Sequence, residues 1–135
     1  MSNIRTATLV WRGDLRFEGG VPGGPTIPVD ADGTTAPGPM AQLLVAAAAC
    51  SAADLVEILR KSRVALSRCD VEVTGTRHED HPRRFIKLHL AFRLAGEGMT
   101  EDKAARAIEL SVTKYCSVIN SLNPDIPVTT EFRLD

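Results

Sequence analysis

Hydrophobic and polar residues alternate with a period of two at the start of the chain, which predicts β-structure there. The stretch NIRTATLVWR, a Gly-Asp turn and LRFEG together predict a β-hairpin over residues 4–18, with Leu15 and Phe17 on one face. A loop is predicted over residues 19–38, because this stretch is rich in glycine and proline and contains one short strand candidate, TIPVD. The chain closes with the pattern of a last strand over residues 126–134.

Two longer stretches in the middle of the chain also have strand period and predict strands over residues 69–78 and 84–95. The polar segment DHPRR between them predicts a turn. In the second strand the alternation assigns side chains to opposite faces, with Ile86, Leu88 and Leu90 on one and Phe85, Lys87 and His89 on the other.

Two further stretches lack this alternation and predict helices. The first, over residues 40–63, is apolar nearly all round, so we expect it to be buried on most sides. The second, over residues 100–122, begins with Thr100 as a predicted N-cap, continues with acidic residues in its first turn, and ends before an Asn-Pro pair. Cys116 is expected toward the end of this second helix.

The order of these elements contains no regular βαβ repeat. The expected fold class is therefore α+β, with a mainly antiparallel sheet packed around the buried first helix and a second helix. A length of 135 residues suits a single domain over residues 1–135.

Composition and charge limit the partners. The chain has 16 Lys and Arg residues against 17 Asp and Glu, so it lacks the strongly basic balance that favours nucleic acid or an anionic membrane surface, and neither is expected as a partner. The N-terminus lacks the basic start and long apolar run of a leader peptide. The longest apolar run, LLVAAAAC, is short for a membrane span. We therefore expect a soluble, cytoplasmic protein.

The three cysteines, Cys50, Cys69 and Cys116, form no CxxC pair, so in a reducing compartment each is either core filler or a working thiol. Cys50 lies mid-helix, and Asp54, one turn later on the same face, opposes formation of its thiolate. Cys116 also has an apolar helical setting. Both residues can be inert filler, or they can face each other as a nucleophile and a resolving thiol. Cys69, which has no companion nearby, is interpreted as structural.

A working Cys50 needs a cation from another element. A thiol of ordinary pKa is about 3% thiolate at pH 7, and lowering its pKa to about 6 raises that fraction roughly thirtyfold. A thiolate of lower pKa is also a weaker nucleophile, and this loss cancels roughly tenfold of the thirtyfold gain in reactivity. A guanidinium that stabilises the charge developing on a breaking O–O bond is therefore required. Arg12, at the hairpin turn, and Arg16, in LRFEG, are the candidates, although each can be a solvated surface charge.

Motifs for metal or phosphate binding are not evident. The histidines, His78, His81 and His89, lack the spacing of a zinc site, so no metal is expected. The segment GGVPGG lacks the lysine and the spacing of a phosphate loop, and is interpreted as a flexible connector.

The contexts of Cys50 and Cys116, taken with the order of the elements, resemble the OsmC/Ohr family and within it the YhfA-like branch. The specific segments are APGPMAQLLVAAAACSAADLVEIL, in which a proline precedes an alanine-rich helix, and AIELSVTKYCSVINSL. The resemblance spans nearly the whole chain. It implies an OsmC-like fold that forms an intertwined homodimer, with two active sites at the subunit interface.

By this resemblance the protein is a thiol peroxidase that reduces organic hydroperoxides in oxidative stress defence. Cys50 would be the peroxidatic thiolate that becomes a sulfenic acid, Cys116 would resolve it as a disulfide, and an external thiol or dithiol would be the reductant, with no cofactor. The chain departs from the Ohr type in carrying Met40 in place of a glutamate, and Arg12 and Arg16 both match the family's arginine loosely. The alternative is a non-peroxidase dimer of this fold that binds a small apolar ligand or a reactive sulfur species at its interface.

Overall fold

The computed structural model describes residues 3–135, and the chain divides into two compact units, Met1–Leu43 and Leu44–Asp135. The first unit is a three-stranded antiparallel sheet of β1 (Thr8–Trp11), β2 (Arg16–Gly20) and β3 (Thr26–Asp30), in that order. Strands β1 and β2 form the hairpin expected within residues 4–18, and β3 is the TIPVD segment of the expected loop.

The Asp30 side chain organises the loop that follows β3. Its carboxylate accepts hydrogen bonds from the backbone N–H groups of Asp32 at 2.9 Å and Thr35 at 3.0 Å, and from the hydroxyls of Thr34 and Thr35. The bonds from Thr35 and Asp32 stabilise the charged form and hold the pKa of Asp30 far below its ordinary value. The loop is thus ordered by a carboxylate rather than by apolar packing.

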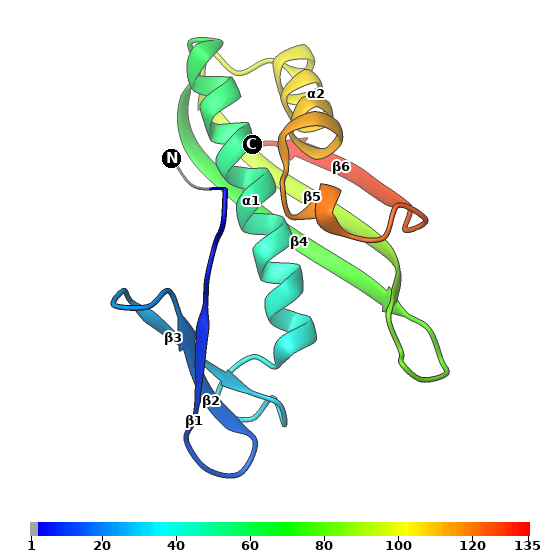
Figure 1. Cartoon of the computed structure of the whole chain (residues 1–135). Coiled ribbons are helices and arrows are strands. Elements are labelled where there is room, and N and C mark those ends of the chain that lie inside the picture. Colours follow the sequence, from blue (N-terminus) through cyan, green and yellow to red (C-terminus); the bar gives the residue numbers. More distant parts are fainter. Residues whose placement is uncertain (1–2) are drawn as a thin grey trace. The chain divides into compact units, whose positions relative to one another are not determined.

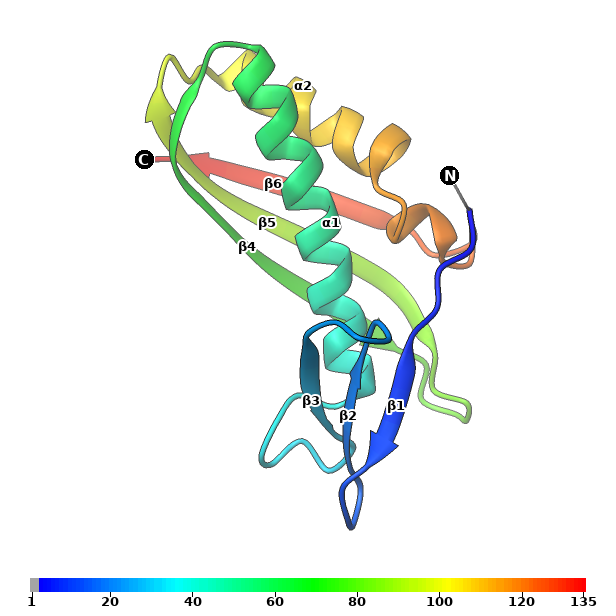
Figure 2. The same cartoon turned by 60° about the vertical axis from the view of Figure 1, so that its left-hand side comes forward.

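The second unit contains most of α1 (Pro39–Lys61), then β4 (Ala65–Arg77), β5 (Phe85–Glu97), α2 (Glu101–Leu110) and β6 (Val128–Leu134). The sheet order is β4-β5-β6, with β4 and β5 antiparallel and β5 and β6 parallel. Figures 1 and 2 show α1 and α2 side by side over one face of this sheet. The result is an α+β fold with two layers in this unit.

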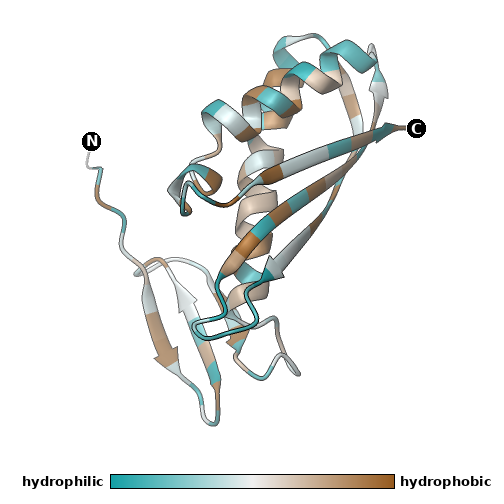
Figure 3. Ribbon diagram, turned by 90° about the vertical axis from the view of Figure 1, so that its right-hand side faces the viewer, coloured by the Kyte–Doolittle hydropathy of each residue, from teal (hydrophilic) through white to brown (hydrophobic). Residues whose placement is uncertain are grey.

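Helix α1 is buried along one stripe, and the expectation that it is buried on most sides is wrong for the single chain. The buried positions, four residues apart, are Ala47, Ser51, Leu55 and Leu59. On the opposite side Val45, Ala49 and Ala53 are exposed, Val45 by 58%. A three-stranded sheet and one short helix are too small to enclose an apolar helix of 23 residues, which Figure 3 shows as mostly pale to brown.

By length and composition alone α1 could cross a membrane, since its most apolar window of 18 residues has a mean hydropathy of 1.7. The core helix of a soluble protein meets the same criterion, and the buried stripe of α1 packs inside the second unit. The absence of a membrane partner stays a prediction.

The inner face of the sheet carries Leu88, Leu90, Phe92 and Leu94, each at most 2% exposed. The pattern breaks at the start of β5, where a register shift opposite Thr76 and Arg77 marks a bulge. Phe85 is consequently buried and Ile86 is 36% exposed, so the assignment of Ile86 to the face of Leu88 and Leu90 is wrong. An extra residue in one strand reverses the alternation beyond it.

The second helix is shorter than the expected 100–122. It has the predicted N-cap, because the Thr100 hydroxyl accepts a hydrogen bond from the Lys103 N–H at 3.2 Å. After Leu110 the chain widens into a π-helical turn, Ser111–Tyr115, closed by a 2.7 Å bond from the Cys116 N–H to the Ser111 carbonyl. Cys116 itself is extended (φ −67, ψ 104) and so lies just after the helix rather than inside it.

Candidate functional site

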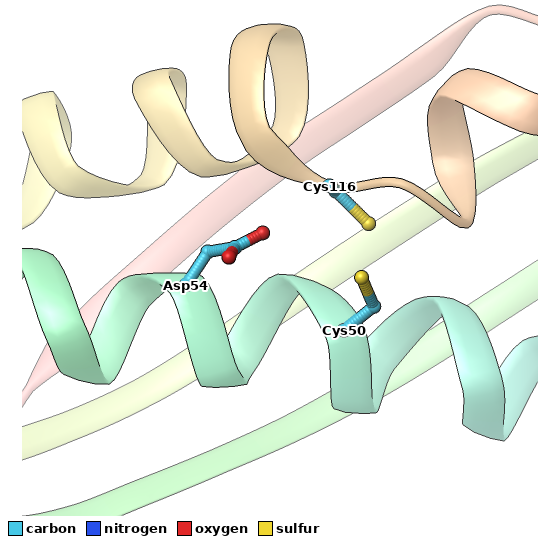
Figure 4. Close-up of side chains that lie close together, drawn as sticks. All are labelled: Cys50, Asp54 and Cys116. Carbon is cyan, nitrogen blue, oxygen red and sulfur yellow. The ribbon is translucent and has the colours of Figure 1, made fainter. Parts of the chain in front are cut away.

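Two cysteines and one carboxylate meet between α1 and the segment that follows α2. The Sγ atoms of Cys50 and Cys116 and a carboxylate oxygen of Asp54 all lie within 4.8 Å of one another. Figure 4 shows the two sulfurs directed toward each other, with Asp54 on the neighbouring turn of α1. The predicted approach of Cys50 to Cys116 is therefore present, and both thiols are free.

The local sequence explains this geometry. Cys50 and Asp54 are four residues apart on α1, a spacing that places both side chains on one helix face. Small residues around them, Ala47 and Ser51, are fully buried, which lets the chain of Cys116 approach the helix closely. Cys116 reaches α1 because the π-helical turn ends the second helix and redirects the backbone. The site thus depends on an alanine-rich helix and on one irregular turn.

The sulfur of Cys116 is fully buried and receives two hydrogen bonds. The Ser51 hydroxyl donates to it at 3.3 Å and the Ile119 backbone N–H at 3.4 Å. Burial raises the pKa of the Cys116 thiol, the bonds from Ser51 and Ile119 oppose that rise, and the neighbouring Cys50 adds to it. Cys50 is half-buried and so is the more accessible of the two sulfurs.

The contribution of Ser51 and Ser111 was absent from the sequence interpretation. The Ser111 hydroxyl donates to the Ser51 carbonyl at 2.6 Å, which ties the π-helical turn to α1. Both serines are fully buried. Their signal in the sequence was a serine within an otherwise apolar helical pattern, next to Cys50 in one case and five residues before Cys116 in the other.

Asp54 has a buried carboxylate oxygen, Oδ2, that finds no hydrogen-bond partner among the described residues. An unpaired buried polar atom of this kind costs about 1–3 kcal/mol. From the sequence, Asp54 was expected only to oppose formation of the Cys50 thiolate. The structure instead makes it the third member of a cluster with both cysteines.

The candidate arginines lie in the first unit, where each has an acidic neighbour. Arg12 lies 3.4 Å from Glu18, and Arg16 lies 3.6 Å from Asp14. Met40 lies in the first turn of α1, also within the first unit. The cysteine cluster belongs to the second unit, so the support of Cys50 by Arg12 or Arg16 stays a prediction.

Cys69 lies on β4 opposite Leu94 and is half-buried. Burial, and then the neighbouring Asp70, raise the pKa of its thiol. Within residues 3–135 it takes no part in the cluster formed by the other two cysteines. This position agrees with a structural role.

The chain is similar to known proteins over most of its length. A family model described as OsmC-like protein matches residues 31–131. Protein YhfA of Escherichia coli (strain K12) is 37% identical over 129 residues, which cover 95% of this chain and 96% of YhfA.

Solved structures share the fold. An OsmC like protein from Mycoplasma pneumoniae superposes with a TM-score of 0.84 at 19% identity and covers 99% of both chains. The organic hydroperoxide resistance protein OhrB of Bacillus subtilis superposes with a TM-score of 0.64 at 16% identity, over 95% of this chain and 98% of OhrB. At such identities these two likenesses show the fold alone.

Proposed function

Because the chain belongs to the OsmC-like protein family, we propose that it is a thiol-dependent peroxidase that reduces organic hydroperoxides in oxidative stress defence in the cytoplasm. The observation that carries the proposal is the approach of the Cys50 and Cys116 sulfurs to within 4.8 Å. A half-buried thiol beside a fully buried one suits a nucleophile that meets substrate and a partner that resolves it.

The reaction proceeds in three steps. The Cys50 thiolate attacks the terminal oxygen of the hydroperoxide, the O–O bond breaks, Cys50 becomes a sulfenic acid, and the alkoxide takes a proton and leaves as an alcohol. The Cys116 sulfur then attacks the Cys50 sulfur, and the hydroxyl leaves as water with the Cys116 proton. An external thiol or dithiol reduces the disulfide by exchange and is itself oxidised to a disulfide.

The hydrogen bonds to Cys116 support its role in the second step. Ser51 and Ile119 both donate to the Cys116 sulfur, and these bonds oppose the rise in pKa caused by burial and so favour the thiolate that must attack the sulfenic acid. No cofactor is required, since the electrons come from the external thiol. Arg12 or Arg16 is proposed to stabilise the charge on the breaking O–O bond.

We also propose that the active form is a homodimer. The uncovered side of α1 carries apolar residues four positions apart, Val45, Ala49 and Ala53, and all are exposed in the single chain. Exposed apolar stripes along a helix are typical of interaction surfaces. The apolar character of this helix supports a second copy as the cover.

A second candidate function rests on Met40. An acid is present at this position in the Ohr type, and its replacement favours a dimer that binds a small apolar ligand or a reactive sulfur species without peroxide turnover. In that case the cysteines would contact the ligand without completing a catalytic cycle.

Peroxide consumption tests the enzyme. Purified protein with a dithiol reductant is expected to consume cumene or tert-butyl hydroperoxide, and Cys50→Ser to lose this activity. Cys69→Ser is the matched control, since Cys69 lies outside the cluster. Full turnover by Cys50→Ser would exclude the proposed mechanism.

Mass spectrometry after stoichiometric peroxide separates the two functions. The peroxidase is expected to lose the mass of two hydrogen atoms as a Cys50–Cys116 disulfide forms, and Cys116→Ser to accumulate sulfenic or sulfinic acid on Cys50. A chain that stays fully reduced while binding an apolar probe would favour the binding protein.

A further inference from the structure

The geometry points to a metal site that the sequence did not predict: we propose that reduced Cys50 and Cys116, together with Asp54, bind one thiophilic divalent cation, for which zinc is the best match. The three donor atoms come from α1 and from the turn after α2. All three lie within 4.8 Å of one another. Histidine spacing gives no sign of this site, because its ligands are sulfur and carboxylate.

The distances suit a tetrahedral cation after a small closure. Zinc–sulfur bonds of about 2.3 Å place two thiolates about 3.8 Å apart in a tetrahedron, and a zinc–carboxylate bond of about 2.0 Å places the oxygen slightly closer. The observed separations of up to 4.8 Å exceed this by only about 1 Å. Side-chain rotation can supply that shift, and the spacing of Cys50 and Asp54 at positions i and i+4 is a chelating spacing on a helix.

The unpartnered oxygen of Asp54 is the second observation that indicates a ligand. Asp54 Oδ2 is buried and no described donor reaches it, and a carboxylate oxygen of Asp54 lies within 4.8 Å of both cysteine sulfurs. A cation bound between the sulfurs and this carboxylate would satisfy the oxygen. A divalent cation would also offset most of the negative charge that two thiolates and a carboxylate bring together.

The surroundings of Cys116 fit a metal thiolate. The hydroxyl of Ser51 and the N–H of Ile119 donate to its sulfur, and hydrogen bonds from a surrounding shell orient and tune metal ligands. The Ser111 hydroxyl fixes the Ser51 carbonyl and so holds the turn against α1. Hydrogen bonds therefore hold together the two segments that carry the proposed ligands, α1 and the turn after α2.

The donor set also selects the metal. Two thiolates favour zinc and similar thiophilic cations, whereas magnesium and calcium prefer oxygen ligands. Three protein ligands leave the fourth tetrahedral position open to water or another small ligand. Binding releases two protons, one from each thiol, and changes no oxidation state.

Metal binding and disulfide formation exclude each other, because both use the same two sulfurs. In the proposed peroxidase, a bound cation would therefore protect the thiols and stop turnover, and this consequence alone rests on the proposed function. Binding itself does not depend on peroxide. A protein without peroxidase activity could still bind the metal, so the two proposals fail separately.

The test is an anaerobic titration of the reduced, metal-free protein with Co²⁺, followed by displacement with Zn²⁺. We expect thiolate-to-cobalt charge-transfer and tetrahedral absorption bands that saturate at one Co²⁺ per chain and disappear on addition of Zn²⁺. Cys50→Ala and Cys116→Ala are expected to abolish the bands. Asp54→Asn is expected to weaken affinity by at least about tenfold, the scale on which even supporting residues act at metal sites.

Two matched variants serve as controls. Cys69→Ala removes a cysteine outside the cluster, and Glu57→Gln removes an acid of the same helix whose partner is Arg60 at 3.2 Å. Both are expected to bind Co²⁺ as the wild type does. The wild-type disulfide form, which keeps every side chain, is expected to bind none, and this arm remains informative if a cysteine variant unfolds.

Any one of four results would overturn the proposal. Three of them are the absence of stoichiometric binding by the reduced wild type, undiminished binding by the disulfide form, and equal affinity in Asp54→Asn and the wild type. Loss of binding in Cys69→Ala would assign the metal to another set of ligands and would also overturn it.

Discussion

The Asp30 carboxylate shows how one residue can order a loop, and its charge makes the loop sensitive to acid. Because the folded pKa lies below the ordinary value of 3.8, the charged form stabilises the fold above that pH, and this stabilisation is lost as the pH falls toward the lower folded value. We expect Asp30→Asn to remove this acid dependence and to speed hydrogen exchange at the Thr35 amide, which donates to Asp30. Asp32→Asn, which keeps the Asp30 carboxylate, is the control, and unchanged exchange in Asp30→Asn would contradict this account.

Ser51 is the residue whose effect on the thiol chemistry is most direct. Its hydroxyl donates to the Cys116 sulfur at 3.3 Å, so Ser51→Ala leaves the Ile119 N–H as the remaining donor among the described residues. A hydrogen bond of about 0.5–1.5 kcal/mol corresponds to roughly two- to tenfold slower formation of the Cys50–Cys116 disulfide. Stopped peroxide reactions followed by mass spectrometry measure this rate.

The control for Ser51 is Ser62→Ala, which removes a hydroxyl that caps the Ile58 carbonyl at the end of the same helix. It should leave the rate of disulfide formation unchanged. An equal slowing in both variants would mean that the effect comes from loss of helix stability rather than from the bond to sulfur.

Residue patterns predicted part of the site. The meeting of Cys50 and Cys116 was expected because two apolar segments each carried a thiol, and helices of one small core must pack together. Asp54 was placed on the correct helix face, but sequence spacing cannot show that its oxygen is left without a partner. That fact depends on the backbone after α2, whose path no local pattern encodes.

At the scale of single elements, Gly75 is required for the packing of β4 against β5. A Cβ at this position would collide with the ring of Phe85 and would lie 3.0 Å from the Leu44 side chain. Because Phe85 is buried, the ring has little room to move. We expect Gly75→Ala to lower the free energy of unfolding by about 1–3 kcal/mol, the usual cost of overpacking.

Urea denaturation measures the effect at Gly75, with Thr74→Ala on the exposed face of β4 as the control. Gly75→Ala should shift the midpoint more than Thr74→Ala does. Equal midpoints would contradict this account. They would show that the backbone at the bulge near Arg77 and Phe85 shifts to make room for the added methyl group at no cost in stability.

The elements that differ from the sequence prediction differ for tertiary reasons. The pattern SVTKYCSV continues the apolar spacing of α2, yet the helix changes character at Ser111, whose hydroxyl bonds to the carbonyl of Ser51 on α1. Likewise the alternation of β5 is regular in sequence, but the bulge moves Phe85 inward and Ile86 outward. The first change is set by a contact between α1 and a turn distant from it in the chain, and the second by the pairing of β5 with its neighbour β4.

At the scale of the whole molecule, element order and two cysteine contexts sufficed to identify the family, and the α+β class agrees with the structure. The sequence patterns predicted too much burial for α1, which is exposed on one side in the single chain. Overall hydrophobicity indicates that a helix will be buried, but it does not indicate whether the cover comes from the same chain. The proposed homodimer uses the exposed side of α1 as its interface.

Val45 provides the test of that second chain. Its side chain is 58% exposed in the single chain, so in a monomer Val45→Glu would be nearly neutral, whereas in a homodimer packed through α1 it would bury a charge against an apolar surface. We expect light scattering after gel filtration to give about twice the chain mass of 14.6 kDa for the wild type and about one chain mass for Val45→Glu. Ile86→Glu, on the outer face of the sheet, is the control and should stay dimeric. A monomeric wild type, or a Val45→Glu variant that remains dimeric with unchanged circular dichroism, would show that the apolar side of α1 is not a homodimer interface. Its exposed residues would then indicate contact with another partner.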